Sequence, residues 1–374
     1  MKITNIEISH HQLALEPPFP ASWDTQPRRK FPATIVRVYD DQGNVGIGSG
    51  DIMYGFDDFV DLFIGQNPLD LVRHNAILNN ISFHAGRPWP LDVALWDLAG
   101  KIKQKPCWQM MGGHDNKIKV YASSGIHRSA EEMVKMANNL VQSGCPALKV
   151  RFGRATLQED FEVLSQVRQA VGDKLTLMVD CNQGWRMPWD IQKPWCVAQA
   201  YEVAQELEKN QVYWMEEPLH RGDYNGMSLL RGKINLKLAG GEMTRESYEF
   251  HTLIERECLD VIQPDVVCSL GMEGLRELAL YAKDKGVIFT PHTWGNGIGL
   301  VANCHLTAGS VGAPFIEFPL DPPEWSIERR DFMLTEPIDA DEQGYIHLSD
   351  EPGLGIQLNE EILMATKSKI ATYQ

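Results

Sequence analysis

The sequence has none of the features of a membrane-spanning, exported or disulfide-stabilised protein. No apolar run approaches the roughly 18 residues that a spanning helix requires. The first ten residues, MKITNIEISH, alternate between polar and apolar instead of forming the apolar region of a signal peptide. The seven cysteines are an odd number without a C-x-x-C pair, which favours free thiols over disulfides or a zinc site. We therefore expect a cytoplasmic protein that binds no membrane.

Basic residues are scarce relative to acidic ones. The chain has 35 Lys and Arg against 50 Asp and Glu, which gives a net charge of −15 at pH 7. A field of this sign repels phosphate backbones and anionic lipids, so nucleic acid is not an expected partner. The 374 residues, 43% of them hydrophobic and 23% charged, are typical of a folded globular protein with a large core.

The first third of the chain predicts an α+β region. Residues 3–15 and the segment ATIVRVYDDQGNVGIGSGD alternate as three antiparallel strands would, and helical periodicity follows over 57–78 and 91–105. The proline-rich segment PPFPASWDTQPRRKFP is predicted to be irregular. We interpret it as a flap over a site, with a second mobile segment at 50–59. A solvated connector is the alternative for the proline-rich segment.

From residue 118 the pattern changes to short apolar runs separated by amphipathic helical stretches. Eight runs are visible: KVYASSGI, ALKVRF, LTLMVD, VYWMEE, LKLAGGE, DVIQPD, VIFTPH and FIEF. Alternating strands and helices are typical of an α/β protein. Eight strands favour a (β/α)8-type TIM barrel over an open sheet, because no glycine-rich dinucleotide loop follows the first run.

Charged residues recur in these runs or at their ends, about one strand–helix unit apart. They are Lys149 and Arg151, Asp180 and Asn182, Glu216 and Glu217, Glu242, Asp265, His292 and Glu317. The carboxyl ends of barrel strands converge on one face, where active sites lie, so these residues are predicted to form one cluster. A single carboxylate after a strand is usually a helix cap or a surface residue, but a series in register is not explained in that way.

The acidic members of the cluster predict a metal site. Asp180, Glu216 and Glu242 would place three carboxylates near one point, and such a group requires a cation to stay ionised. All-oxygen ligation favours Mg²⁺ over Zn²⁺. In the E-E-P run, Glu216 and Glu217 point to opposite strand faces, so only one of them can be a direct ligand. The alternation alone does not choose between them.

The other charged residues of the cluster predict a site that binds an anionic substrate and transfers a proton. Lys149 and Arg151 are two residues apart and project to one side of their strand, where they would meet a substrate carboxylate. Histidine has an unperturbed pKa near neutrality, so His292 is the expected proton carrier. Asp265, one strand away, is placed to fix its tautomer.

Taken together, these motifs resemble the enolase superfamily, and in particular its mandelate racemase subgroup. The resemblance covers essentially the whole chain, including the D-x-N, E-E-P and G-G-E motifs, the LDVALWDLAGK helix and the closing DEPGLGI segment. It implies an α/β fold in which an α+β capping domain covers a TIM barrel. The implied divisions are a capping domain at 1–117, the barrel with the site at 118–329, and a carboxyl-terminal segment at 330–374 that returns to the cap.

The resemblance also implies residue roles. It assigns Mg²⁺ to Asp180, Glu216 and Glu242, which resolves the E-E-P pair in favour of Glu216. It assigns a catalytic dyad to His292 and Asp265. It places the acidic residue of the eighth strand, Glu317, facing the substrate, and it implies a homo-oligomer. The family reaction begins with removal of the proton α to a carboxylate, and the metal stabilises the resulting ene-diolate.

The sequence departs from the subgroup at Arg151, where the second Lys of a K-x-K motif commonly serves as a base. Arginine is effectively never deprotonated, so two-base racemisation is disfavoured. We therefore expect a lyase that dehydrates an acid sugar to a 2-keto-3-deoxy acid, with contacts from Asn182, Trp23 and Tyr54. The alternatives are a cycloisomerase of a sugar-acid lactone or anhydro sugar acid, then a racemase or epimerase, then a non-catalytic metal and sugar-acid binding protein.

Overall fold

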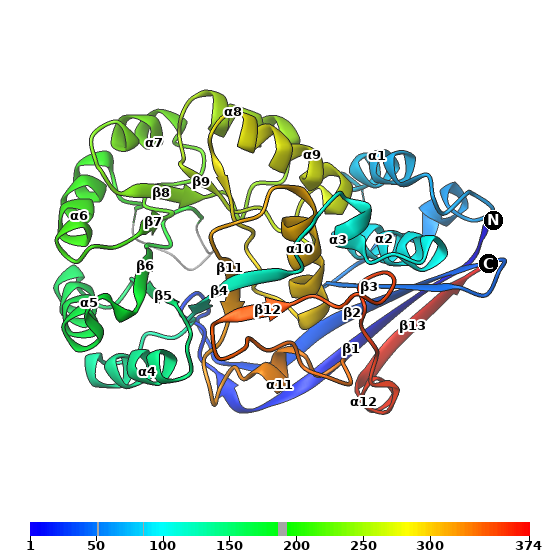
Figure 1. Cartoon of the computed structure of the whole chain (residues 1–374), viewed down its shortest axis with the longest axis horizontal. Coiled ribbons are helices and arrows are strands. Elements are labelled where there is room, and N and C mark those ends of the chain that lie inside the picture. The colour runs from blue at the N-terminus through cyan, green and yellow to red at the C-terminus, as the bar shows by residue number, and fades with distance from the viewer. Residues whose placement is uncertain (51, 85, 186–192) are drawn as a thin grey trace.

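The computed structural model of the chain describes residues 1–50, 52–84, 86–185 and 193–374. A barrel ringed by helices lies beside a smaller α+β unit, which holds both termini (Figure 1). The α/β barrel with an antiparallel cap is the fold predicted from the sequence, and this prediction is confirmed. The divisions at 117/118 and 329/330 stay predictions. None of the helices in the described ranges has both the length and the apolarity to cross a membrane.

The antiparallel sheet of the cap joins the two ends of the chain. Its strands lie in the order β13-β1-β2-β3. The carboxyl-terminal strand β13 pairs with β1 from Ile6 to His11, so the end of the chain returns to the first strand (Figure 1). The bounds are β1 Ile3–Phe19, β2 Arg28–Asp40, β3 Val45–Gly50 and β13 Lys367–Tyr373.

The proline-rich segment is more regular than its composition predicts. Strand β1 continues to Phe19 and β2 begins at Arg28, so only residues 20–27 lie outside the two strands. β13 pairs with β1 only as far as His11, and β3 pairs with β2 only from Thr34, so the rest of β1 and β2 is a ribbon with unpaired outer edges. Proline is tolerated at such edges because it breaks no ladder hydrogen bond. The prediction of a wholly irregular segment is therefore wrong.

The predicted helix at 91–105 is present, and the one at 57–78 is divided. Gly65, with a φ of +79°, and Pro68 lie between a short 3-10 helix and the next α-helix. Helix α2 packs directly on β3, where a Cβ at Gly46 would lie 2.1 Å from the Ala94 carbonyl oxygen. The helices are η1 Asp57–Leu62, α1 Leu71–Ile81, α2 Trp89–Lys103 and α3 Cys107–Met110.

The eight apolar runs form eight parallel barrel strands within the described residues. Their pairing order is β10-β9-β8-β7-β6-β5-β4-β11. Thr293, just after β10, links the two end strands, because its Oγ1 donates to the Glu317 carbonyl oxygen of β11 at 2.8 Å. The strands are β4 Lys117–Ser123, β5 Ala147–Arg151, β6 Thr176–Asp180, β7 Trp214–Glu216, β8 Lys237–Gly240, β9 Val261–Ile262, β10 Ile288–Phe289 and β11 Ile316–Pro319.

Among the described residues, seven α-helices alternate with these strands and lie outside the barrel (Figure 1). Inside it, Tyr121, Met178 and Trp214 are fully buried against one another. A packed interior leaves the polar residues of the strands at their carboxyl ends, which is the face that carries the site. The helices are α4 Ala130–Gln142, α5 Leu157–Val171, α6 Val197–Lys209, α7 Tyr224–Arg231, α8 Ser247–Glu255, α9 Gly271–Asp284 and α10 Gly297–Ser310. The remaining short elements are η2 Gly172–Lys174, α11 Ile327–Arg330, β12 Tyr345–His347 and α12 Glu360–Thr366.

Candidate active site

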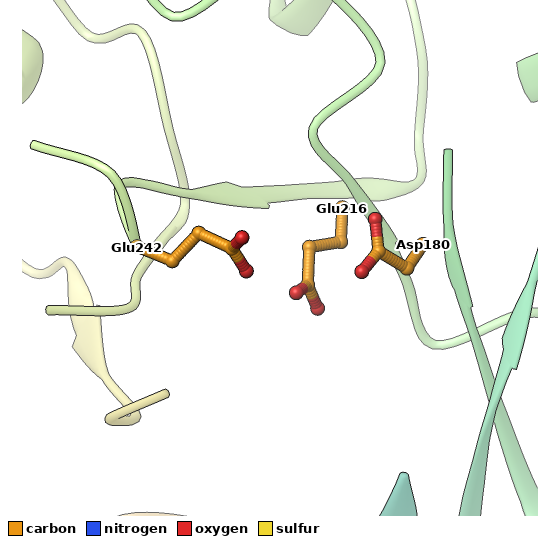
Figure 2. Close-up of side chains that lie close together, drawn as sticks. All are labelled: Asp180, Glu216 and Glu242. Carbon is orange, nitrogen blue, oxygen red and sulfur yellow. The ribbon is translucent and has the colours of Figure 1, made fainter. Parts of the chain in front are cut away.

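Three buried carboxylates meet at the carboxyl ends of adjacent strands. Asp180 ends β6, Glu216 ends β7 and Glu242 follows β8. One oxygen from each lies within 4.8 Å of the others (Figure 2). All three side chains are buried. The donors are exclusively carboxylate oxygens, which suits a hard divalent cation such as Mg²⁺. These residues could therefore hold the predicted metal.

Glu216 is fixed by three hydrogen-bond donors. Lys149 Nζ lies 2.6 Å from its Oε1, while Trp214 Nε1 and Gln263 Nε2 donate to its Oε2 at 3.2 and 2.9 Å. Burial raises the pKa of Glu216 to about 7, although the positive charge of Lys149 acts to lower it. Neither Trp214 nor Gln263 was predicted from the sequence. Trp214 precedes Glu216 by two residues in β7, and Gln263 precedes Asp265 by two in the run that follows β9. The two-residue spacing was the available signal.

Glu217 is separated from the triad. Its φ of +45° is unusual for a residue other than glycine. Its buried carboxyl oxygens have no hydrogen-bond partner among the described residues. Burial, followed by repulsion from Glu242, raises the pKa of Glu217 well above its usual range. Burial therefore favours the neutral form of Glu217, and Glu217 is not one of the three carboxylates that meet at the triad.

Lys149 is a cation among carboxylates. Its Nζ lies 2.8 Å from Glu317 Oε1 and 3.7 Å from Asp180 Oδ2, in addition to its contact with Glu216. Burial lowers its pKa, but the surrounding carboxylates outweigh burial and hold the pKa well above its usual value. Burial likewise raises the pKa of Glu317, but Lys149 and then His292 lower it to about 2. Both groups are therefore ionised at neutral pH, and Lys149 is not a free base.

Arg151 is held in place on every side. Its NH1 lies 2.7 Å from Asp180 Oδ2 and 3.2 Å from Asn182 Oδ1, and its Nε donates to the Ser124 carbonyl oxygen at 2.9 Å. The guanidinium carbon lies 4.4 Å from the ring centre of Trp23 on the flap. Burial lowers its pKa, but the neighbouring carboxylates raise it above that of a free arginine. Arg151 can therefore orient Asp180 but cannot accept a proton.

Asn182 orients the same carboxylate from the backbone. Its φ is +52°, and its N–H donates to Asp180 Oδ1 at 2.9 Å. Its buried Nδ2 has no hydrogen-bond partner in the described ranges. This amide has a spare donor, although contact with a substrate stays a prediction.

His292 and Asp265 lie together, as the sequence predicts. His292 Nδ1 is 3.0 Å from Asp265 Oδ2, and Asp265 Oδ1 accepts hydrogen bonds from Asn303 Nδ2 at 2.9 Å and the Val267 N–H at 3.1 Å. The other ring nitrogen, Nε2, lies 3.9 Å from Glu242 Oε2 and so faces the triad. Asn303 was missed, and its only sign was that it is the first polar side chain after the apolar start of α10.

The ionisation of His292 follows from these neighbours. Burial lowers its pKa, but Glu242, Glu317 and Asp265 outweigh burial and raise the pKa to about 9. A cation at the triad would neutralise Glu242 and reduce this rise. The imidazole is thus placed to exchange a proton with a group next to the metal site.

A cavity of about 250 Å³ opens onto His292 and Glu242. Trp185 also orients Glu242, since its Nε1 donates to Oε1 at 3.2 Å. The structure brings Trp23 to this cavity but not Tyr54, whose side chain is 64% exposed and whose backbone pairs with Gly86. The predicted mobile segment also includes residue 51, which lies outside the described ranges. The lining residues include Trp23, Arg28, Arg87, Arg151, Trp185, Glu242, Arg245, His292, Trp294 and Trp325.

Sequence comparison finds relatives of two enzymatic classes. An arabinonate dehydratase of Saccharolobus solfataricus is 28% identical over 283 residues, which cover 75% of this chain and 71% of the relative. A D-galactarolactone cycloisomerase of Agrobacterium fabrum is 26% identical and covers 97% of this chain and 98% of the relative. The chain is thus related to enzymes, and the comparison leaves both a lyase and an isomerase open.

Structural comparison supports the fold. The structure of an L-talarate dehydratase from Polaromonas sp. JS666, complexed with Mg and L-glucarate, superimposes with a TM-score of 0.85 at 23% identity. The superposition covers all of this chain and 99% of that one. The family described as enolase C-terminal domain-like matches residues 132–362, more than half of the sequence. The chain therefore belongs to the enolase C-terminal domain-like family.

Proposed function

We propose that the chain is a Mg²⁺-dependent enzyme that removes the proton α to the carboxylate of an acid sugar and dehydrates it to a 2-keto-3-deoxy acid. The observation that carries this proposal is the position of His292. One nitrogen is bonded to Asp265 and the other faces Glu242 of the triad. A base beside a metal site is the arrangement that abstraction of an α proton requires.

In this reaction His292 would act twice. With Nδ1–H donated to Asp265, Nε2 accepts the α proton, and the electron pair of the broken C–H bond enters an ene-diolate. The C–O bond at the β carbon then breaks, and the imidazolium returns its proton to the departing hydroxyl, which leaves as water. The resulting enol tautomerises to the 2-keto-3-deoxy acid.

The other residues would provide charge and orientation. A bound Mg²⁺ would offset the negative charge that develops on the substrate carboxylate. Lys149 offsets part of the negative charge of Glu216 and Glu317, while Arg151 and Asn182 orient Asp180. These contacts keep the carboxylates in fixed positions before substrate binds, which lowers the cost of reorganisation.

A cycloisomerase is the second candidate, acting on a sugar-acid lactone or anhydro sugar acid. It is favoured by the Agrobacterium relative, a cycloisomerase whose match covers 97% of this chain and 98% of the relative. One histidine also suffices for that reaction. A racemase is less well supported, because Arg151 is bound to Asp180 and cannot serve as the second base.

A library of acid sugars, incubated with Mg²⁺ and the enzyme in D₂O, tests the proposal. A dehydratase would give a product lighter than its substrate by one water, whereas a cycloisomerase would leave the mass unchanged apart from deuterium. Absence of both turnover and α-deuterium incorporation across the library would contradict the proposed chemistry. The implied homo-oligomer is part of the proposal, and light scattering coupled to size exclusion tests it.

A further inference from the structure

Arg245 contributes a positive charge to the cavity. It lies on the loop between β8 and α8, three residues after Glu242, and lines the same cavity as His292. Its NH1 donates to the Cys268 carbonyl oxygen. Within the described ranges, no carboxylate lies at ion-pair distance from its guanidinium. Its side chain is only partly exposed.

Two other cavity arginines, Arg28 and Arg151, differ in this respect. Arg28 on the flap pairs with Asp24, and Arg151 pairs with Asp180. Their charges are therefore balanced by the protein itself. Arg245 has five N–H donors, of which the backbone carbonyl takes one. A partly buried cation without a counter-ion is costly, and a bound anion would offset that cost.

The position of Arg245 suits the distal end of a substrate. The reacting end would lie at Glu242 and His292, and Arg245 lines the cavity that extends from them. The hydrogen bond from Arg245 NH1 to the Cys268 carbonyl oxygen limits the motion of the guanidinium and leaves its other N–H donors for a ligand. A planar guanidinium binds a carboxylate through two parallel hydrogen bonds, which gives both affinity and orientation.

We propose that Arg245 binds a second carboxylate, so that the substrates are aldarates, with a carboxylate at each end, instead of aldonates. This inference rests on the proposed function, since it takes the first carboxylate to be the one at the triad. Arg245 is then a specificity-determining residue, which the chemistry at His292 does not require.

The experiment compares galactarate, galactonate and further matched aldarate and aldonate pairs as substrates for the Mg²⁺-loaded full chain. Steady-state kinetics give the selectivity, the ratio of kcat/KM for the aldarate to that for its aldonate. Arg245→Gln should lower this selectivity by about 10- to 100-fold, the range for loss of a charge-assisted hydrogen bond. Arg245→Lys should recover part of it. Arg28→Gln is the matched control, because it removes a cavity arginine that already has a partner and should change the selectivity little.

Binding provides a readout without turnover. In the His292→Asn background, calorimetry should show that Arg245→Gln weakens binding of the aldarate and leaves binding of the aldonate nearly unchanged. An unaltered Mg²⁺-induced rise in Tm would show that the variant is folded.

The outcomes separate this inference from the proposed function. Wild-type preference for aldonates, or equal effects of Arg245→Gln and Arg28→Gln on selectivity, would overturn the role of Arg245 while the α-proton chemistry stands. If no acid sugar in the panel undergoes α-proton exchange, the proposed function fails, and the inference fails with it. Weak galactarate binding that Arg245→Gln leaves unchanged would also contradict the subsite.

Discussion

Replacement of a triad carboxylate should remove the stabilisation that Mg²⁺ gives to the folded protein. The oxygens of Asp180, Glu216 and Glu242 lie within 4.8 Å of one another. At that distance and an effective dielectric constant near 20, two unit charges repel by about 3.5 kcal/mol. Lys149 and Arg151 offset part of this repulsion, and a divalent cation is expected to offset the rest.

The size of the Mg²⁺-induced stabilisation follows from the linkage between binding and folding. At a Mg²⁺ concentration of 100 times Kd, the folded state gains about 2.7 kcal/mol. For domains of roughly 150–250 residues, Tm rises by about 2–4 °C per kcal/mol, so a rise of about 5 °C is expected for this larger chain. The assay is thermal unfolding of EDTA-treated protein at increasing Mg²⁺ concentration. Asp180→Asn, Glu216→Gln and Glu242→Gln should each largely abolish the rise.

Glu217→Gln is the control, because Glu217 lies outside the triad and the amide has nearly the same shape as the acid. The Glu217→Gln protein should keep the full Mg²⁺-induced rise in Tm. A triad variant that responds like wild type, or a Glu217→Gln protein that does not respond, would refute the assignment of the ligands. The pH dependence provides a second check. Burial holds the pKa of Glu216 at about 7 without metal, so Mg²⁺ must displace a proton, and its affinity should fall as pH decreases below 7.

Three further predictions concern residues around the triad. Asp265→Asn should lower the pKa of His292 by removing a carboxylate partner; the histidine ring resonances in NMR titrations of the metal-free protein report this shift, and an unchanged titration would count against the dyad. Arg151→Lys should retain some activity in steady-state assays but lose the guanidinium's simultaneous contacts with Asp180, Asn182 and the Ser124 carbonyl, so an inactive yet folded protein would point to a direct chemical role. Trp23→Ala should reduce kcat/KM at least tenfold, because it removes the ring over Arg151, while leaving the Mg²⁺-induced Tm shift intact; unchanged kinetics would exclude a role for the flap.

The barrel was predictable because one rule links its sequence to its shape. Short apolar runs separated by amphipathic helices give parallel strands, and charged residues at the strand ends then share one face. For this reason Asp180, Glu216 and Glu242 could be placed together without coordinates. The proline-rich segment was not predictable in the same way. Whether its prolines interrupt a strand depends on which neighbours pair with β1 and β2, and local sequence does not carry that information.

The contacts that support the site were the hardest feature to predict from the sequence. Trp214, Gln263 and Asn303 have no motif of their own, since their importance comes only from the carboxylate that each one meets. Arg245 was overlooked for a similar reason. Its significance lies in the lack of an anionic partner among the described residues, which no sequence pattern reveals. Tyr54 is the opposite case, because the sequence marks it as a candidate but it is 64% exposed and is not among the residues that line the cavity at His292; its contact with a substrate stays a prediction.

We propose that His292 alone exchanges the α proton beside the candidate metal site. The most direct test is deuterium incorporation at the α carbon of an identified acid-sugar substrate, followed by NMR in D₂O with Mg²⁺ present. Wild type should show exchange or turnover, and His292→Asn should show neither while retaining the Mg²⁺-induced rise in Tm. Robust exchange of either α epimer by His292→Asn would reveal a second base and contradict the claim.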